Sequence, residues 1–117
     1  MKVAVTAGGT GPEMYVDSRF SRCNCFVIVD PETGEQELLP NPRLACHQRA
    51  GRHVAQELAD RGVTCVITGR IGPHARGALE AAGIEIYCTE AGRTVFDALF
   101  LYRAERLSAL APAATTD

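Results

Sequence analysis

Short apolar runs rich in β-branched residues alternate along this chain with segments of helical periodicity, and this alternation constrains the fold more than any other feature. Each run has the length of a buried strand and is bounded by glycine, proline or polar residues. A Pro-Glu-Thr-Gly turn at residues 31–34 predicts that the second and third runs form a hairpin. The predicted strands are residues 2–6, 25–30, 36–39, 63–68 and 84–88.

Three segments predict helices. Residues 48–61 carry apolar side chains on one face and end at Gly62, a common helix stop. Pro73 suits the first turn of a helix over residues 74–82, and residues 94–106 form the last helix. The order of elements predicts an α/β fold in which helices cover a central sheet. Because sites in such folds lie beyond the carboxyl ends of the strands, loops 7–24 and 69–73 are expected to face one crevice.

Composition narrows the classes of protein to consider. A chain of 117 residues with 46% hydrophobic and 22% charged side chains has the size and mix of one compact domain. Its net charge of −2 gives no pull toward nucleic acid or an anionic membrane. No apolar run approaches the roughly 20 residues of a spanning helix, and the first residues turn glycine-rich too soon for a signal peptide. We expect a cytoplasmic domain over residues 1–106 and a disordered tail over 107–117.

The cysteines are the sharpest chemical signal. There are five, too few for a disulfide scaffold and odd in number, so reduced thiols are expected. Cys23 and Cys25 lie two positions apart at the end of a loop, and Cys46-His47 precedes a helix whose dipole favours a thiolate. Together they make a soft donor set suited to an iron–sulfur cluster, zinc, or a copper or molybdenum sulfide. The structural alternative is that Cys25 belongs to the core and Cys23 is an idle loop thiol. Cys65 and Cys88 are expected to pack in the core.

Basic residues gather on the loops of the predicted crevice. Such a rim would compensate an anionic guest, although a scatter of solvated arginines explains it equally well. His74, at a helix start, and Gly72, in the turn before it, are candidates for ligand contact, whereas His53 is expected to be solvated. The arginines are Arg19, Arg22, Arg43, Arg49, Arg52 and Arg70.

Common catalytic patterns are poorly represented. The segment Ala-Gly-Gly-Thr-Gly at residues 7–11 matches neither dinucleotide-binding nor Walker sequences. The acidic residues show no metal-binding spacing, and no serine lies in a nucleophile elbow. A thiol nucleophile such as Cys46 with His47 or His74 as base has no defining motif. These features favour a binding protein over an enzyme.

Several segments, in this order and spacing, resemble the dinitrogenase iron–molybdenum cofactor-binding family. They are MKVAV, the loop segment VDSRFSR at 16–22, FVIVDPETGE, the stretch from AGRHVAQELADRGVTCVITGRIGPHARG to IEIY, and TVFDAL. The resemblance covers residues 1–106. It implies a ribonuclease-H-like fold with a five-stranded mixed sheet in the order 3-2-1-4-5, strand two antiparallel, and non-catalytic binding of metal–sulfur clusters.

One departure from the family pattern bears on the ligands. Arg19 stands where several nitrogenase cofactor carriers have a cofactor-linked histidine, and two cysteines follow where relatives carry non-ligand residues. We therefore expect thiolates to replace imidazole, with Cys23, Cys25 and Cys46 as ligands and His47 as the fourth. Arg19, Arg22, Arg70, Gly72 and His74 would contact the cluster.

The sequence thus predicts a carrier of a metal–sulfur cluster, containing iron or molybdenum, that works in cofactor assembly or storage. Expected partners are proteins that donate or accept the cluster, and a homodimer is possible. Two alternatives stay open: a thiol-redox enzyme using Cys23 and Cys25, and a metal-free regulatory interaction module.

Overall fold

A computed structural model describes residues 2–8, 14–17, 20, 23, 25–41, 47–89 and 92–109, without the side chains of 47–51 and 108–109. The strands are β1 (Lys2–Gly8), β2 (Tyr15–Val16), β3 (Cys25–Val29), β4 (Gln36–Pro40), β5 (Val63–Thr68), β6 (Glu85–Cys88) and β7 (Ser108–Ala109). The helices are α1 (His47–Asp60), α2 (Pro73–Ala81) and α3 (Val95–Arg103). The predicted mixed α/β class is confirmed.

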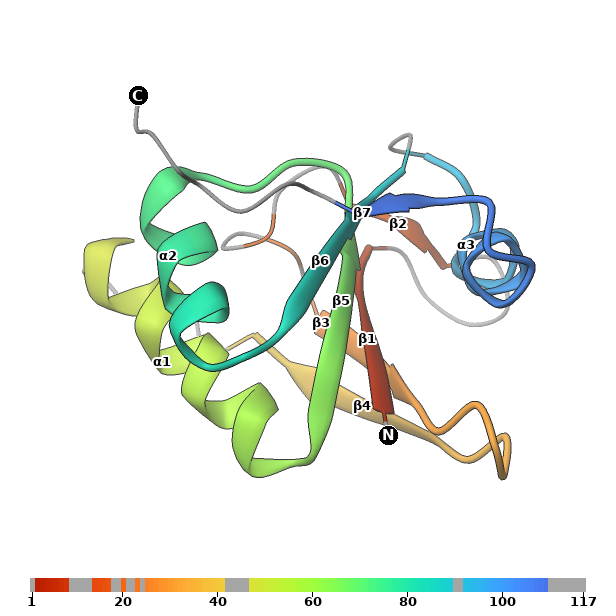
Figure 1. Cartoon of the computed structure of the whole chain (residues 1–117), viewed down its shortest axis with the longest axis horizontal. Coiled ribbons are helices and arrows are strands. Elements are labelled where there is room, and N and C mark those ends of the chain that lie inside the picture. The colour runs from red at the N-terminus through yellow and green to blue at the C-terminus, as the bar shows by residue number, and fades with distance from the viewer. Residues whose placement is uncertain are drawn as a thin grey trace.

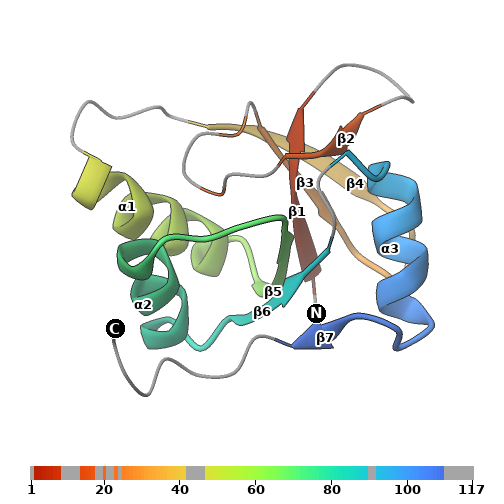
Figure 2. The same ribbon diagram turned by 90° about the horizontal axis from the view of Figure 1, so that it is seen from above.

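The strands form one open mixed sheet in the order β4-β3-β1-β5-β6-β7, and β2 pairs with the end of β1. β1 runs parallel to β5, and β5 runs parallel to β6. β3 is antiparallel to both β1 and β4, so the predicted hairpin is confirmed. Helices α1 and α2 cover one face of the sheet and α3 covers the other (Figure 1). The view from above shows the same three layers (Figure 2).

The core is divided by the sheet into two clusters. One lies under α1 and α2 and includes Phe20, Phe26 and Leu58, and the other lies under α3 and includes Val5, Ile67 and Ala98. Each central strand contributes residues to both clusters, because successive side chains point to opposite faces of the sheet. Burial on both faces explains why the central strands are continuous apolar runs.

Glycine ends the first two helices as the sequence predicts. Gly62 and Gly83 adopt positive φ angles of 86° and 77°, and their N–H groups donate to the carbonyl oxygens of Ala59 and Glu80 at 3.0 Å. α1 spans residues 47–60 instead of the predicted 48–61. Thr94 caps α3, since its hydroxyl accepts a hydrogen bond from the Asp97 N–H at 3.0 Å.

The prediction was wrong at the ends of β1 and α3, and it missed the two short strands β2 and β7. β1 continues to Gly8 instead of ending at residue 6, because β2 pairs with Ala7 and Gly8 inside the predicted loop. α3 ends at Arg103, three residues early, because Glu105 takes a left-handed conformation with φ of 59°. The Arg106 N–H then donates to the Leu101 carbonyl, which is the usual hydrogen bond of a helix terminus. β7, in the predicted tail, pairs with β6. Residues 110–117 lie outside the described part.

Among the described residues, no helix combines the length and the apolar character needed to cross a bilayer.

Candidate functional site

The carboxyl ends of the parallel strands β1, β5 and β6 lie side by side at one end of the sheet, which we call the carboxyl edge. Several side chains of this edge project from the face that α1 and α2 cover. Thr6, Thr68 and Cys88 lie on this side, because they alternate with residues of the cluster under α3. The segment after β2 and the turn between β5 and α2 border the same edge. Ligand sites in open α/β sheets form at such edges.

Two buried threonines hold the edge together. The Thr6 hydroxyl lies 3.0 Å from the Thr68 hydroxyl and 3.1 Å from the Asp17 carbonyl oxygen. The Thr68 hydroxyl donates to the Arg70 carbonyl oxygen at 3.1 Å. Both side chains are fully buried. Each hydroxyl contacts the carbonyl oxygen of one loop, so the two threonines hold both loops against the sheet. Neither threonine side chain carries a charge.

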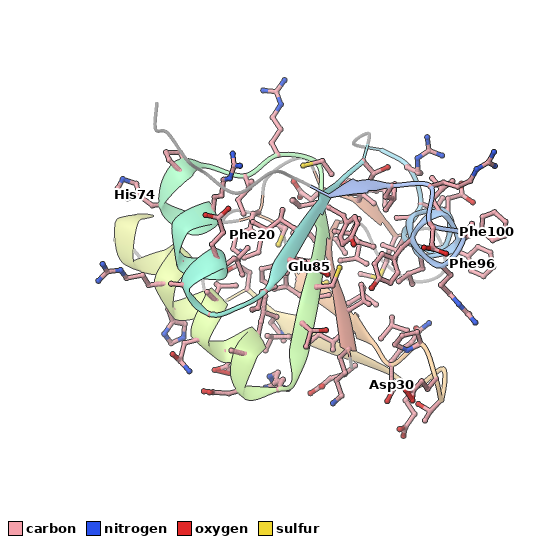
Figure 3. The ribbon with its side chains drawn as sticks, viewed as in Figure 1. Phe20, Asp30, His74, Glu85, Phe96 and Phe100 are labelled. Carbon is pink, nitrogen blue, oxygen red and sulfur yellow. The ribbon has the colours of Figure 1, made fainter. Side chains whose placement is uncertain are left out.

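Backbone hydrogen bonds join the same two loops directly. The Phe20 N–H donates to the Arg70 carbonyl at 3.2 Å, and the Gly69 N–H donates to the Asp17 carbonyl at 3.3 Å. Phe20 itself is buried and packs on Phe26, with ring centroids 5.3 Å apart. Figure 3 shows its ring in the interior. Phe20 therefore joins the core to the turn that follows β5.

The turn into α2 presents three of the predicted contact residues together. Arg70, Gly72 and His74 are all exposed, and Figure 3 shows His74 at the start of α2 pointing outward. Gly72 is the N-cap residue and has no side chain to cap the first turn, which begins with Pro73. The positive end of the helix dipole and the exposed Arg70 guanidinium favour an anion at this place.

Cys23 occupies a core position. Its side chain is fully buried in the cluster under α1 and α2, and its thiol donates to the Phe20 carbonyl oxygen at 3.4 Å. The Asn41 amide donates to the Cys23 carbonyl oxygen at 2.9 Å. Burial raises the pKa of the Cys23 thiol to about 12, so the thiol is protonated at neutral pH. A ligand role for Cys23 therefore requires the surrounding segment to rearrange, and that role stays a prediction.

Cys25 lies on the opposite side of the sheet from Cys23. It pairs with Ala7 at the start of β3 and packs, half-buried, against the cluster under α3. Burial raises its pKa as well. This arrangement agrees with the structural alternative for Cys25. Within the described ranges, no three His, Cys, Asp or Glu side chains gather in a way that could hold a metal ion.

The remaining predicted site residues are not described. Arg19, Arg22 and Cys46 lie outside the described residues, and only the backbone of His47 is described, where it begins α1. The predicted ligand set of thiols and imidazole therefore stays a prediction. The expectations for Cys65, which is buried, and for His53, which is exposed, are confirmed.

The model of the dinitrogenase iron-molybdenum cofactor family matches residues 1–105. The chain belongs to this family. Two solved structures are similar to this chain over nearly its whole length. The apo form of the orange protein from Desulfovibrio gigas is 37% identical, with a TM-score of 0.86, and the match covers 95% of this chain and 93% of that one. A putative NifB protein from Thermotoga is 31% identical, with a TM-score of 0.81, covering 99% of this chain and 96% of that one.

A curated relative of this cofactor-family chain matches over a shorter stretch. An uncharacterised protein of Methanocaldococcus jannaschii is 34% identical over 71 residues, which are 58% of this chain and 60% of that protein.

The sequence alone missed two side chains at the edge of this cofactor-family fold. Tyr15, 43% exposed, pairs with Gly8, and both face the side of α1 and α2 because their neighbours Ala7 and Val16 pack under α3. A Cβ on Gly8 would lie 2.9 Å from the Tyr15 ring, so the phenol lies directly over this glycine. Tyr15 therefore borders the carboxyl edge. The sequence does not indicate this position, because β2 has only two residues and shows no alternation, and the pairing of β2 with β1 is what places it.

Cys88 is the other side chain. The sequence predicts that it packs in the core, although its position at the end of a strand also allows a place at the edge. It is half-buried opposite Thr68. Burial raises the pKa of its thiol, and the positive charge of Arg76 opposes that rise. A thiol near a guanidinium at the carboxyl edge is a further soft donor on the side that holds Arg70 and His74.

Proposed function

We propose that this chain binds a metal–sulfur cluster at the carboxyl edge of the sheet and passes it to another protein. The observation that carries the proposal is membership of the iron–molybdenum cofactor family over residues 1–105, together with an anion-favouring turn at 70–74. The fold is proposed to be ribonuclease-H-like, the location cytoplasmic, and the partners a donor and an acceptor of the cluster. The cargo is an iron–sulfur or molybdenum-containing sulfide cluster.

The described residues fit an anionic guest better than a fully thiolate-ligated metal. Arg70 and the N-terminal end of α2 attract negative charge, whereas the thiol of Cys23 is buried and protonated. Cluster sulfides carry negative charge and accept hydrogen bonds, so the edge can hold such a cargo through its outer atoms. A cluster that is held by only a few metal–protein bonds also suits a carrier, because the cluster must be released again.

The proposed contacts divide by chemistry. Arg19, Arg22 and Arg70 neutralise the cluster, and Gly72 and His74 meet it at the start of α2. Cys46 and His47 are proposed as exchangeable ligands. Cys25, at the same end of the sheet but on its α3 face, joins them if the start of β3 rearranges, as does Cys23 if its segment opens. The buried pair Thr6 and Thr68 acts by positioning the two loops.

The alternative of a thiol-redox enzyme requires a cysteine with a lowered pKa. Burial instead raises the pKa of Cys23, Cys25, Cys65 and Cys88. These are all the described cysteines. Among them, none has the electrostatic setting of an attacking thiolate, which favours carriage.

The test is anaerobic loading. The chain is incubated with ferrous iron and sulfide, or with tetrathiomolybdate, and desalted, and bound metal and acid-labile sulfide are measured per chain. We expect retention with visible absorption by the parent, loss of both in Cys25→Ser/Cys46→Ser, and salt-sensitive, weakened retention in Arg70→Ala/His74→Ala.

Cys65→Ala is the matched control, since it removes a thiol from the cluster under α3 and should retain cargo. Cys23→Ala separates the two roles of that residue: retained cargo with lowered stability assigns it to the core. A parent chain that keeps neither metal nor sulfide would overturn carriage and favour the metal-free interaction module, and zinc without sulfide would indicate a structural site.

A further inference from the structure

Helix α3 is apolar on almost every side. Its nine residues include only two charged ones, Asp97 in the first turn and Arg103 in the last. Val95 and Ala98 are buried against the sheet. A helix that is apolar all round normally has neighbours all round, but α3 is the outermost layer on its face of the sheet (Figures 1 and 2).

Two phenylalanines project from the outer side of α3. Phe96 is 77% exposed and Phe100 is 61% exposed, and they lie one helical turn apart. Figure 3 shows both rings pointing away from the sheet. Burying such a side chain is favourable in proportion to the apolar area removed from water, so this pair is a strong anchor for a partner.

An apolar groove lies between α3 and the β3–β4 hairpin, and Phe96, Phe100 and Arg103 line its α3 wall. It has a volume of about 580 Å³, and its walls are mainly apolar, including Val3, Val29, Pro31 and Tyr102. Leu38 of β4, 60% exposed, faces the same side of the sheet because it pairs with Val27 of the cluster under α3. Projecting rings and a hollow large enough to take one are therefore adjacent on one face.

The charges on this face indicate what covers it. Within the described part of the chain, neither Asp97 nor Arg103 has an ion-pair partner. They stand at opposite ends of α3, so an antiparallel second α3 centred near Phe100 would bring each Asp97 to the Arg103 of the other copy. A two-fold axis also places the rings of each copy against the groove of the other, as self-complementary interfaces require.

We propose that this chain forms a two-fold symmetric homodimer through α3 and the adjoining groove. The occupant of the groove is the Phe96–Phe100 ridge of a second copy. The carboxyl edge near α2 lies on the other side of the sheet, so the dimer leaves both proposed cargo sites open. The proposal rests on α3 and the adjoining groove and does not depend on cluster carriage.

The test measures the mass of the metal-free full chain by sedimentation over a wide range of concentrations. We expect a concentration-dependent dimer, and a monomer for Phe96→Ser/Phe100→Ser at the same concentrations. Both rings are exposed, so this variant should keep its circular dichroism spectrum. Tyr15→Ser, which removes an exposed aromatic residue near the carboxyl edge, is the matched control and should dimerise like the parent.

Charge reversal tests the antiparallel arrangement. Arg103→Asp should raise the dimer dissociation constant about tenfold or more by placing like charges together, and Asp97→Arg/Arg103→Asp should restore most of the affinity. A parent chain that is monomeric at every concentration overturns the proposal and leaves the groove to a small amphipathic molecule or another protein. A dimer that survives the phenylalanine replacement, or that is indifferent to charge reversal, overturns it as well.

Discussion

Cys65 is a buried thiol whose ionisation is coupled to folding. It lies among the apolar residues under α3, and burial raises its pKa from 9.0 to about 12, while a hydrogen bond with Tyr102 opposes the rise. Cys23, on the other face of the sheet, has a pKa raised to about the same value. Both thiols therefore resist ionisation in the folded protein.

The free energy of unfolding should fall as pH rises between about 9 and about 12. In this range the unfolded chain has lost the thiol protons and the folded chain still holds them, so rising pH favours unfolding. Each thiol contributes a slope of at most about 1.4 kcal/mol per pH unit. Urea denaturation under reducing conditions, repeated across the lower half of this range, measures the slope.

Cys65→Ala should make that slope shallower by at most about 1.4 kcal/mol per pH unit, which is the contribution of one thiol. Ile67→Val is the matched control, since it lowers stability in the same cluster but keeps the thiol, and its slope should equal that of the parent. Equal slopes in Cys65→Ala and the parent would show that Cys65 ionises as readily in the folded chain as in the unfolded one.

Residue chemistry at the site was only partly predictable from the sequence. Arg70, Gly72 and His74 follow a strand with a clear apolar pattern, so their place at the carboxyl edge could be inferred. The burial of Cys23 could not, because it depends on Phe20 folding back into the core. Thr6 and Thr68 look like ordinary strand residues, and their role arises only when β1 and β5 pair.

At the scale of elements, long segments with a strong period were predictable and short ones were not. The β3–β4 hairpin and the three helices follow from turn residues and periodicity. β2 and β7 contain two residues each, which is too few to show any alternation. The end of α3 was missed because Glu105, instead of glycine, adopts the left-handed conformation that stops it.

The pairing of β1 with β2 predicts a coupling between Gly8 and Tyr15. An alanine at position 8 would place its Cβ 2.9 Å from the tyrosine ring, and the ring must swing aside at a cost of about 1 kcal/mol. In a Tyr15→Ala background the same Gly8→Ala change should be neutral or stabilising, because a strand alanine restricts the unfolded chain.

The free energies of unfolding of the four proteins measure this coupling. A double-mutant cycle should give about 1 kcal/mol. An equal effect of Gly8→Ala in both backgrounds would mean that the ring does not lie over the glycine.

For the whole molecule, the sheet separates two proposed surfaces. The cargo edge lies on the side of α1 and α2, and the dimer face lies on the side of α3 (Figure 2). Sites that share no contacting residues usually act independently. Phe96→Ser/Phe100→Ser should therefore retain the same metal per chain as the parent, and Arg70→Ala/His74→Ala should keep the parent's dimer dissociation constant.

Metal analysis and sedimentation of both variants check this independence. A dimer variant that loses cargo, or an edge variant that loses the dimer, would show that the two surfaces communicate through the sheet.

The contact between Thr6 and Thr68 joins residues 62 positions apart. During synthesis the first strand and its loop leave the ribosome long before the strand that completes the edge. A nascent chain therefore exposes Cys23 and Cys25 before the carboxyl edge of the sheet is complete. If the chain carries a cluster as proposed, loading can begin only after translation has passed β5, because the edge is incomplete until β5 pairs with β1.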